Sequence, residues 1–212
     1  MKELRRIIKE FGPFGTFVYS EIFFIWEPYD NFTFSVAFSL LGALVAIFVI
    51  VLVFSGNICT TLLVVLNMGL VELNLLAMIW YWNLELNFIT VINLILAIGL
   101  AVDYSAHIAH TYNVTVSDYD CVTRRERRIS KVRKTFSKIG NSVFHGAVST
   151  FLAIVTISAS TSYIFRAFFK QWFCIIVFGM LHGFMLLPVL LTLFGPLTKT
   201  SVVAPFDPKD KK

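Results

Sequence analysis

The sequence predicts an all-α integral membrane protein with five transmembrane helices. Of its 212 residues, 57% are hydrophobic and only 15% are charged, and the mean hydropathy is +0.77. This balance excludes an ordinary soluble domain. A helix that crosses a bilayer needs about 20 mainly apolar residues. Five runs meet that length, at about 32–54, 58–82, 86–112, 142–165 and 171–194.

Residues 1–30 are expected to be the end of an extracellular or luminal domain and an amphipathic lead-in that lies at the membrane interface. A helical pattern over 1–11 is cut by Gly12 and Pro13, and the aromatic stretch that follows contains Glu21 and Glu27, which makes it too charged to span. The start lacks the features of a signal peptide. We therefore expect the chain to begin within a longer protein.

The basic residues predict the orientation of the spans. Residues 113–140 contain eight Lys and Arg and residues 197–212 contain four, out of 18 in the chain. With five spans these segments lie on one side, and an excess of positive charge favours the cytosol. We expect a basic cytosolic loop at 113–140, a cytosolic tail at 197–212 and an extracellular or luminal amino terminus. Apolar residues at helical spacing in the loop indicate a helix on the inner leaflet, either as a plain anchor or for lipid recognition.

The third span contains a carboxylate and two imidazoles. At 100° per residue they share one helical face with a glycine, within an arc of about 80°: Gly99, Asp103, His107 and His110. A charge in hydrocarbon costs about 3 kcal/mol and usually has a function. An isolated carboxylate there takes up a proton or pairs with a cation, so Asp103 is the candidate ion-coupling site. The alternative is a hydrogen-bonded cluster that only holds helices together.

Further polar residues lie in the fourth and second spans. In the fourth span, hydroxyl groups and a histidine share an arc of about 60° around the helix. These residues are Ser142, His145, Ser149, Thr156 and Ser160. The arc predicts that this helix faces Asp103. We take the first three as candidates for lining an ion path, although hydroxyls also serve helix packing. Glu72 lies near the middle of the second span, so it must face protein or a cavity. It is a further path-lining candidate.

Small residues and a proline predict close packing in the last span. Gly179 and Gly183 form a small-xxx-small pair, and Pro188 is expected to kink the helix.

Several functional classes are not expected. The His, Cys, Asp and Glu residues lack the tight spacing of a metal site. The three cysteines fall in two spans and the cytosolic loop, so no disulfide framework is implied. Basic residues gathered between spans favour membrane orientation over nucleic-acid binding. An intramembrane aspartyl protease needs two carboxylates that share a site, and this chain has one intramembrane Asp. No enzymatic activity is expected.

The third span resembles a motif of a known transporter family. Gly99 and Asp103, in the stretch that ends at His107, resemble the GxxxD element of the tenth transmembrane helix in the Patched, Dispatched and Niemann–Pick type C branch of the resistance-nodulation-division (RND) superfamily. The stretch from Trp80 to Asn87 resembles the junction between the ninth and tenth helices of this family. The stretches 140–150, 158–170 and 178–196 are similar to the last two helices of the family. These longer strings are most similar to patched domain-containing proteins.

The resemblance implies a fold and a function. The five helices would be helices eight to twelve of twelve, part of the carboxy-terminal half-bundle of an RND-type transporter. The implied activity is the movement of sterols or other lipids, driven by a proton or Na⁺ that binds at Asp103, with His107 and His110 tuning the site. The implied partners are membrane lipids, with a sterol as one possible ligand, and the amino-terminal half of the transporter. That half carries an acidic residue that partners Asp103. The implied location is the plasma membrane or an endomembrane.

No cofactor beyond the proton or Na⁺ is expected. Two other interpretations stay open: a lipid-binding receptor or regulatory membrane protein without coupled transport, and a non-functional fragment.

Overall fold

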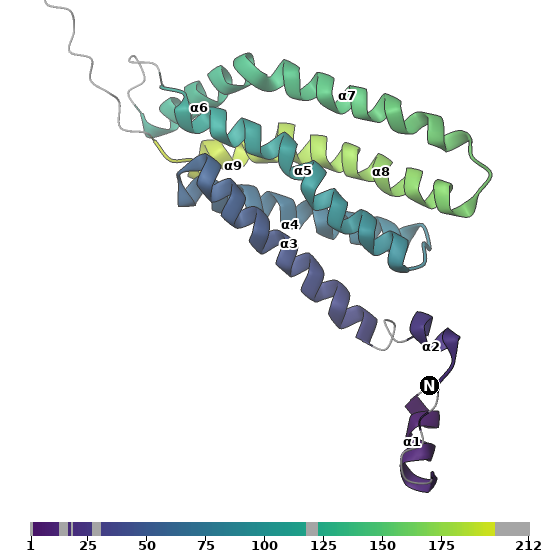
Figure 1. Ribbon diagram of the computed structural model, residues 1–212. Helices are drawn as coiled ribbons and strands as arrows, with labels where there is room; N and C mark the ends of the chain where they lie inside the picture. Colours follow the sequence, from purple (N-terminus) through teal and green to yellow (C-terminus); the bar gives the residue numbers. More distant parts are fainter. Residues whose placement is uncertain (1, 13–16, 18, 27–30, 118–122, 198–212) are drawn as a thin grey trace, which may run out of the picture. The chain divides into compact units, whose positions relative to one another are not determined.

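The computed structural model describes residues 2–12, 17, 19–26, 31–117 and 123–197, and within these residues every regular element is a helix (Figure 1). The chain forms two units, Met1–Leu41 and Gly42–Lys212. The first contains α1 (Lys2–Phe11), α2 (Glu21–Trp26) and the beginning of α3 (Phe32–Ser55). Within the predicted segment 1–30, residues 1, 13–16, 18 and 27–30 lie outside the described residues, as does the tail after residue 197.

The second unit contains the end of α3 and a bundle of long helices. Its elements are α4 (Ile58–Tyr81), α5 (Phe88–Val114), α6 (Arg124–Thr135), the π turn η2 (Phe136–Gly140), α7 (Asn141–Val155), the 3-10 turn η3 (Thr156–Ala159), α8 (Tyr163–Leu181), the π turn η4 (His182–Leu186) and α9 (Leu187–Phe194). Across the described residues, five continuous helices are long and apolar enough to cross a membrane: Phe32–Ser55, Ile58–Tyr81, Phe88–Val114, Arg124–Ala159 and Tyr163–Phe194. The prediction of an all-α protein with five apolar helices is confirmed.

Polar residues define the short connections at which these helices begin. Gly56 turns the chain after α3 with a φ of 61°, a conformation that glycine adopts without a steric cost. Asn57 then caps α4, because its Oδ1 accepts hydrogen bonds from Cys59 N (3.0 Å) and Thr60 N (3.3 Å). Asn87 caps α5 in the same way, by accepting from Thr90 N at 3.0 Å. Both caps satisfy backbone donors that a helix start leaves without a partner.

The boundary between the last two spans differs from the prediction. We expected the fourth span to end at 165 and a link to contain Arg166 and Lys170, but the turn lies at 160–162 and both residues belong to α8. The turn forms where serine and threonine favour non-helical backbone. The basic residues are compatible with the start of a span because long cationic side chains reach the membrane surface. Lys170 Nζ lies 5.5 Å from the centroid of the Trp82 ring.

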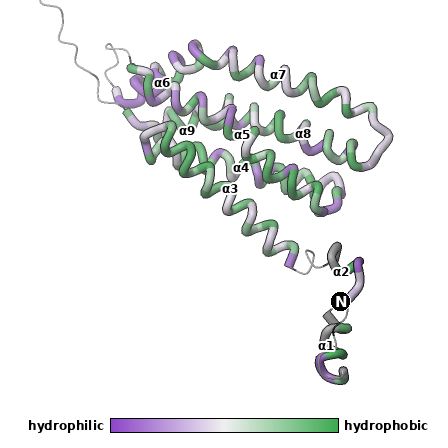
Figure 2. The backbone as a smooth tube through the Cα atoms, in the orientation of Figure 1, coloured by the Kyte–Doolittle hydropathy of each residue, from purple (hydrophilic) through white to green (hydrophobic). Residues whose placement is uncertain are grey.

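The predicted loop at 113–140 is also more helical than expected. The amphipathic helix expected there is α6, but it does not end before the fourth span. It continues through the π turn η2 into α7, so a single helix runs from Arg124 to Ala159. Figure 2 shows hydrophilic residues gathered along α6, whereas α8 and α9 are mainly hydrophobic. The basic segment is therefore a continuation of a membrane-spanning helix.

The core of the bundle surrounds α5, which packs against α4 and α8. A Cβ atom placed at Gly179 would lie 3.0 Å from Cδ2 of Tyr104, and one at Gly183 would lie 3.4 Å from Tyr104 Cβ. The two glycines of α8 and η4 thus let Tyr104 approach the helix backbone, as small residues do in membrane bundles. Pro188 lies just after the π turn η4. In a regular α-helix its ring would clash with the carbonyl of Phe184, four residues earlier.

Buried polar pairs join the helices at several depths. Thr60 Oγ1 donates to Asn113 Oδ1 (2.8 Å) and Asn67 Nδ2 donates to Ser105 Oγ (3.0 Å), which links α4 to α5 twice. Further along α5, the side-chain amides of Asn93 and Gln171 form a hydrogen bond of 2.6 Å that links α5 to α8. A helix that slid or rotated would break these hydrogen bonds, and the hydrocarbon interior contains no water to replace them. The pairs therefore set the register of the bundle.

The close approach at Gly179 leads to a stability prediction. We expect Gly179→Val to lower the free energy of unfolding by about 2 kcal/mol, because the added methyl groups overlap the Tyr104 ring. Thermal unfolding of the detergent-solubilised protein measures the change. Gly69→Val is the matched control, since no atom of a neighbouring element lies within 4 Å of a Cβ at that position. Equal loss of stability in both variants would contradict close packing at Gly179.

Candidate functional site

The charged and ionisable residues predicted as a site on α5 lie on a side of the helix that α4 and α8 leave uncovered. Asp103, His107 and His110 are exposed, as is Gly99, whereas the opposite side of α5 is buried against α4 and α8. Outside its own helix, no described atom lies within 4 Å of a Cβ placed at Gly99. The four residues thus share one open face. A carboxylate on a face with no protein cover is costly in lipid, by about 3 kcal/mol.

An open groove of about 360 Å³ runs beside this face, between α5 and the η2–α7 segment. Asp103 and His107 line it from α5, and Ser142 lines it from the start of α7. The groove also has an apolar part, and its remaining lining residues are Leu100, Tyr104, Ile139, Val143, Gly146 and Thr150. The carboxylate, the imidazole and the hydroxyl groups supply the oxygen and nitrogen atoms that could hold a proton or bind a cation such as Na⁺.

His110 lies outside the groove and contacts α3. Its Nδ1 is 3.0 Å from the carbonyl oxygen of Phe54, near the end of that helix. In the tautomer with a proton on Nδ1, the imidazole donates to a carbonyl that the helix end leaves without a partner. Asn113, one turn further along α5, donates to Ser55 Oγ at 2.6 Å. This part of the polar face therefore holds the end of α3.

The stripe predicted on α7 lies only partly along the groove. Ser142 lines it, but His145 and Ser149 are exposed side chains outside its lining. Besides Val143, the residues that follow Ser142 in the groove are Gly146 and Thr150, which lie four and eight positions after it. Sequence analysis missed these two positions, although small and hydroxyl residues spaced by four from Ser142 were a usable signal.

Glu72 is buried on α4, with an exposed fraction of 5%, and does not line this groove. Neither carboxylate oxygen has a hydrogen-bond partner among the described residues. The neighbouring asparagines have other partners: Asn67 bonds to Ser105, and Asn74 Nδ2 lies 3.1 Å from His182 Nε2. The structure does not bring Glu72 to Asp103.

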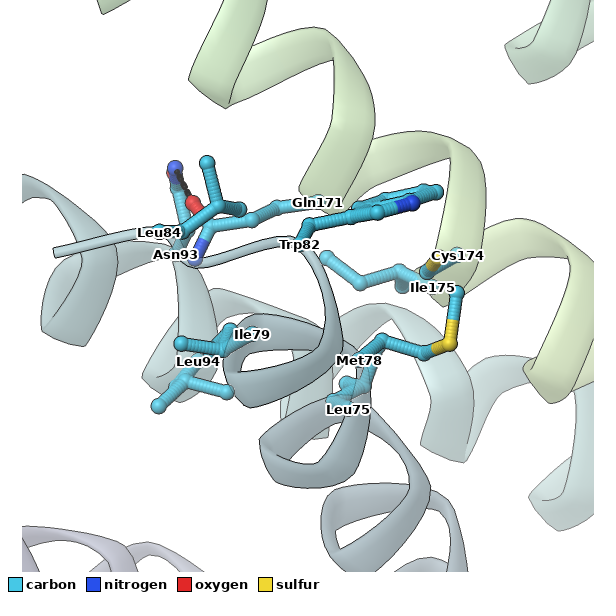
Figure 3. A pocket seen from close by; sticks show the side chains of 10 residues that line it. All are labelled: Leu75, Met78, Ile79, Trp82, Leu84, Asn93, Leu94, Gln171, Cys174 and Ile175. Atoms are coloured by element: carbon cyan, nitrogen blue, oxygen red, sulfur yellow. Dashed lines mark hydrogen bonds between the residues drawn. The ribbon is translucent and has the colours of Figure 1, made fainter. Parts of the chain in front are cut away.

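A second hollow lies near the other end of the bundle and is far smaller. Figure 3 shows its lining, in which Trp82, Met78 and the Asn93–Gln171 pair surround a space of about 10 Å³. Such a space holds at most one water molecule, whereas ligand sites occupy hundreds of Å³. A lipid does not fit there, so of these two hollows the α5–α7 groove is the better candidate site.

The described residues contain no group of three or more His, Cys, Asp and Glu side chains that could hold a metal ion. A cation at Asp103 would therefore depend on one carboxylate together with hydroxyl, carbonyl or water oxygens. This donor set is more typical of a weakly held monovalent ion than of a tetrahedral zinc site.

Comparison of the sequence with known proteins identifies a family. Residues 32–200 match the model of the AcrB/AcrD/AcrF family. Over 92% of its length the chain is 34% identical to the Niemann-Pick type C1-related protein of Toxoplasma gondii, and it covers 16% of that protein. Over 94% it is 33% identical to NPC intracellular cholesterol transporter 1 homolog 1b of Drosophila melanogaster, again covering 16%.

A patched protein is among the relatives as well. The chain is 27% identical, over 95% of its length, to Protein patched homolog 1 of Caenorhabditis elegans, of which it covers 14%. The chain thus spans about one sixth of the length of these relatives. With five apolar helices and a family match over most of its residues, this multi-pass membrane chain belongs to the AcrB/AcrD/AcrF family, in the branch of the Niemann–Pick type C1 and Patched proteins.

Proposed function

We propose that this chain is part of a membrane transporter of sterols or other lipids, in which Asp103 couples lipid movement to a proton or Na⁺ gradient. The observation that supports it best is the position of Asp103, on an uncovered face of α5 beside an open groove. The similarity to a cholesterol transporter homologue favours a sterol or a related lipid as the substrate.

The coupling follows from the cost of a charge in hydrocarbon. While Asp103 is ionised, its face of α5 is stable only against water, a cation or a polar partner. When a proton or Na⁺ neutralises it, the face can pack against an apolar surface. The difference of about 3 kcal/mol corresponds to a shift of about 100-fold between two arrangements. Ion binding can thus drive a movement of α5.

The surface that covers this face is, in our proposal, the amino-terminal half of the transporter. Gly99 lacks a side chain and has no neighbouring element near it in the described bundle, so a facing helix can approach closely there. His107 adjusts the affinity of Asp103 for the ion, and Ser142 with Thr150 lines the route along the groove. We assign substrate selection to parts of the transporter that lie outside this chain and that correspond to the uncovered parts of its longer relatives.

The coupling role is tested by Asp103→Asn, which keeps the size of the side chain and removes its charge. We expect gradient-driven lipid transport by the native protein to fall at least about tenfold, since the variant cannot exchange a proton or cation. Lipid flux into vesicles with an imposed proton or Na⁺ gradient measures it. The control is Glu85→Gln, the corresponding change at an exposed turn. Undiminished transport by Asp103→Asn would remove Asp103 from the coupling mechanism.

A lipid receptor without transport is distinguished by collapsing the gradient. If the protein is a coupled transporter, we expect lipid accumulation to stop when an ionophore dissipates the gradient, while equilibrium lipid binding is unchanged. Parallel flux and binding measurements on one vesicle preparation check this. Lipid movement that continues at the same rate after the collapse argues against coupling.

We also propose that the end of the bundle with α6 is cytosolic, because its positive charge favours that side. In a chain with Cys59, Cys121 and Cys174 replaced by alanine, we expect Glu85→Cys to react with a membrane-impermeant maleimide on intact cells. Arg125→Cys should react only after permeabilisation. The reverse labelling pattern would show that the orientation is inverted.

A further inference from the structure

Five basic residues of the continuous α6–η2 segment fall into two sets with different surroundings. Arg128 and Lys131 point toward α9: Arg128 Nη1 donates to the carbonyl of Leu193, and Lys131 Nζ lies 3.4 Å from the carbonyl oxygen of Pro196. Lys131 also lies 4.2 Å from the centroid of the Tyr112 ring. Cations are favourable beside the carbonyl groups at a helix carboxyl end. This first set is explained by the packing of α6 on α9.

The second set lines a separate, wide groove along α6 and η2. Arg133, Lys134 and Lys138 border a hollow of about 890 Å³, together with Ser130 and Ser137. Arg133 and Lys138 are exposed and have no hydrogen bond or ion pair to another described residue. Helix packing therefore does not account for their charges.

One acidic side chain also lines this groove, and its carboxylate has a structural role. Glu126 Oε2 accepts a hydrogen bond from Thr123 N at 3.1 Å, at the start of α6. The capping arrangement uses the acidic group where negative charge stabilises a helix start. Three basic residues against one acidic residue leave the lining positive, which suits an anion.

The groove also has an apolar wall, contributed by Val114 and Val116 at the end of α5 and by Ile129 on α6. The exposed fractions of these side chains are 64%, 43% and 40%. An inorganic anion or a nucleic-acid backbone would gain nothing from this wall. A phospholipid would, since its phosphate can meet the cations while its glycerol and acyl chains lie along apolar side chains. The wall continues from α5, a candidate membrane span.

We propose that the groove of Arg133, Lys134 and Lys138 binds the phosphate headgroup of an anionic phospholipid. The site differs from a general attraction between a basic segment and a membrane, because it depends on the side of α6 from which the cations project. It is independent of the transport proposal. Bound lipid would hold α6, and through η2 the start of α7, at the membrane surface. Ser142 of the α5–α7 groove lies at that start.

The test compares two double variants that remove the same charge from the α6–η2 segment. Arg133→Gln with Lys138→Gln alters the groove, whereas Arg124→Gln with Arg125→Gln alters exposed residues outside it. Binding of dioctanoyl phosphatidylserine and dioctanoyl phosphatidylcholine to the purified full chain in detergent is measured by calorimetry. Size-exclusion profiles and helical content verify that both variants fold.

We expect the chain to bind phosphatidylserine more tightly than phosphatidylcholine, and the groove variant to lose about tenfold or more in affinity for phosphatidylserine. The control variant should lose less than about threefold. Equal losses in both variants would overturn the site in favour of general charge attraction. Equal binding of the two lipids, or displacement of phosphatidylserine by an equal concentration of inorganic phosphate, would overturn anionic phospholipid as the ligand.

Discussion

The architecture depends on one constraint: a hydrocarbon interior offers no partner to a polar group, so the helices must supply partners to one another. The asparagines of α4 and α5 meet this demand across helix boundaries, as Asn67 does with Ser105 and Asn93 with Gln171. Such bonds contribute only about 0.6 kcal/mol each in membrane proteins. Their main effect is therefore on register, because any other alignment leaves amides without partners.

Asp103 differs from these paired residues because its side chain is exposed. Its carboxylate lies on the open side of α5, with its face left uncovered by α4 and α8. Glu72 presents the opposite case, since it is buried but has no described partner. A buried carboxylate is held by packing, whereas an exposed one can exchange its ion with the surroundings. This difference in access is why we assign the coupling role to Asp103 and none to Glu72.

The basic end of the bundle holds cations in two different surroundings. The inward cations of α6 bond to the carbonyl groups at the end of α9, and in doing so fix which side of α6 faces outward. The outward cations then line the groove beside the end of α5. A count of charges in this segment predicts a membrane orientation, but it does not separate these two sets.

The sequence by itself determined the five apolar helices and the common face of Gly99, Asp103 and His107, because the length of an apolar run and the 3.6-residue period are local properties. Only the tertiary structure decided that Thr150 lines the groove in place of Ser149. This feature depends on how each helix is rotated about its own axis. Contacts between helices, such as Tyr104 against Gly179, set that rotation, and no single helix encodes it.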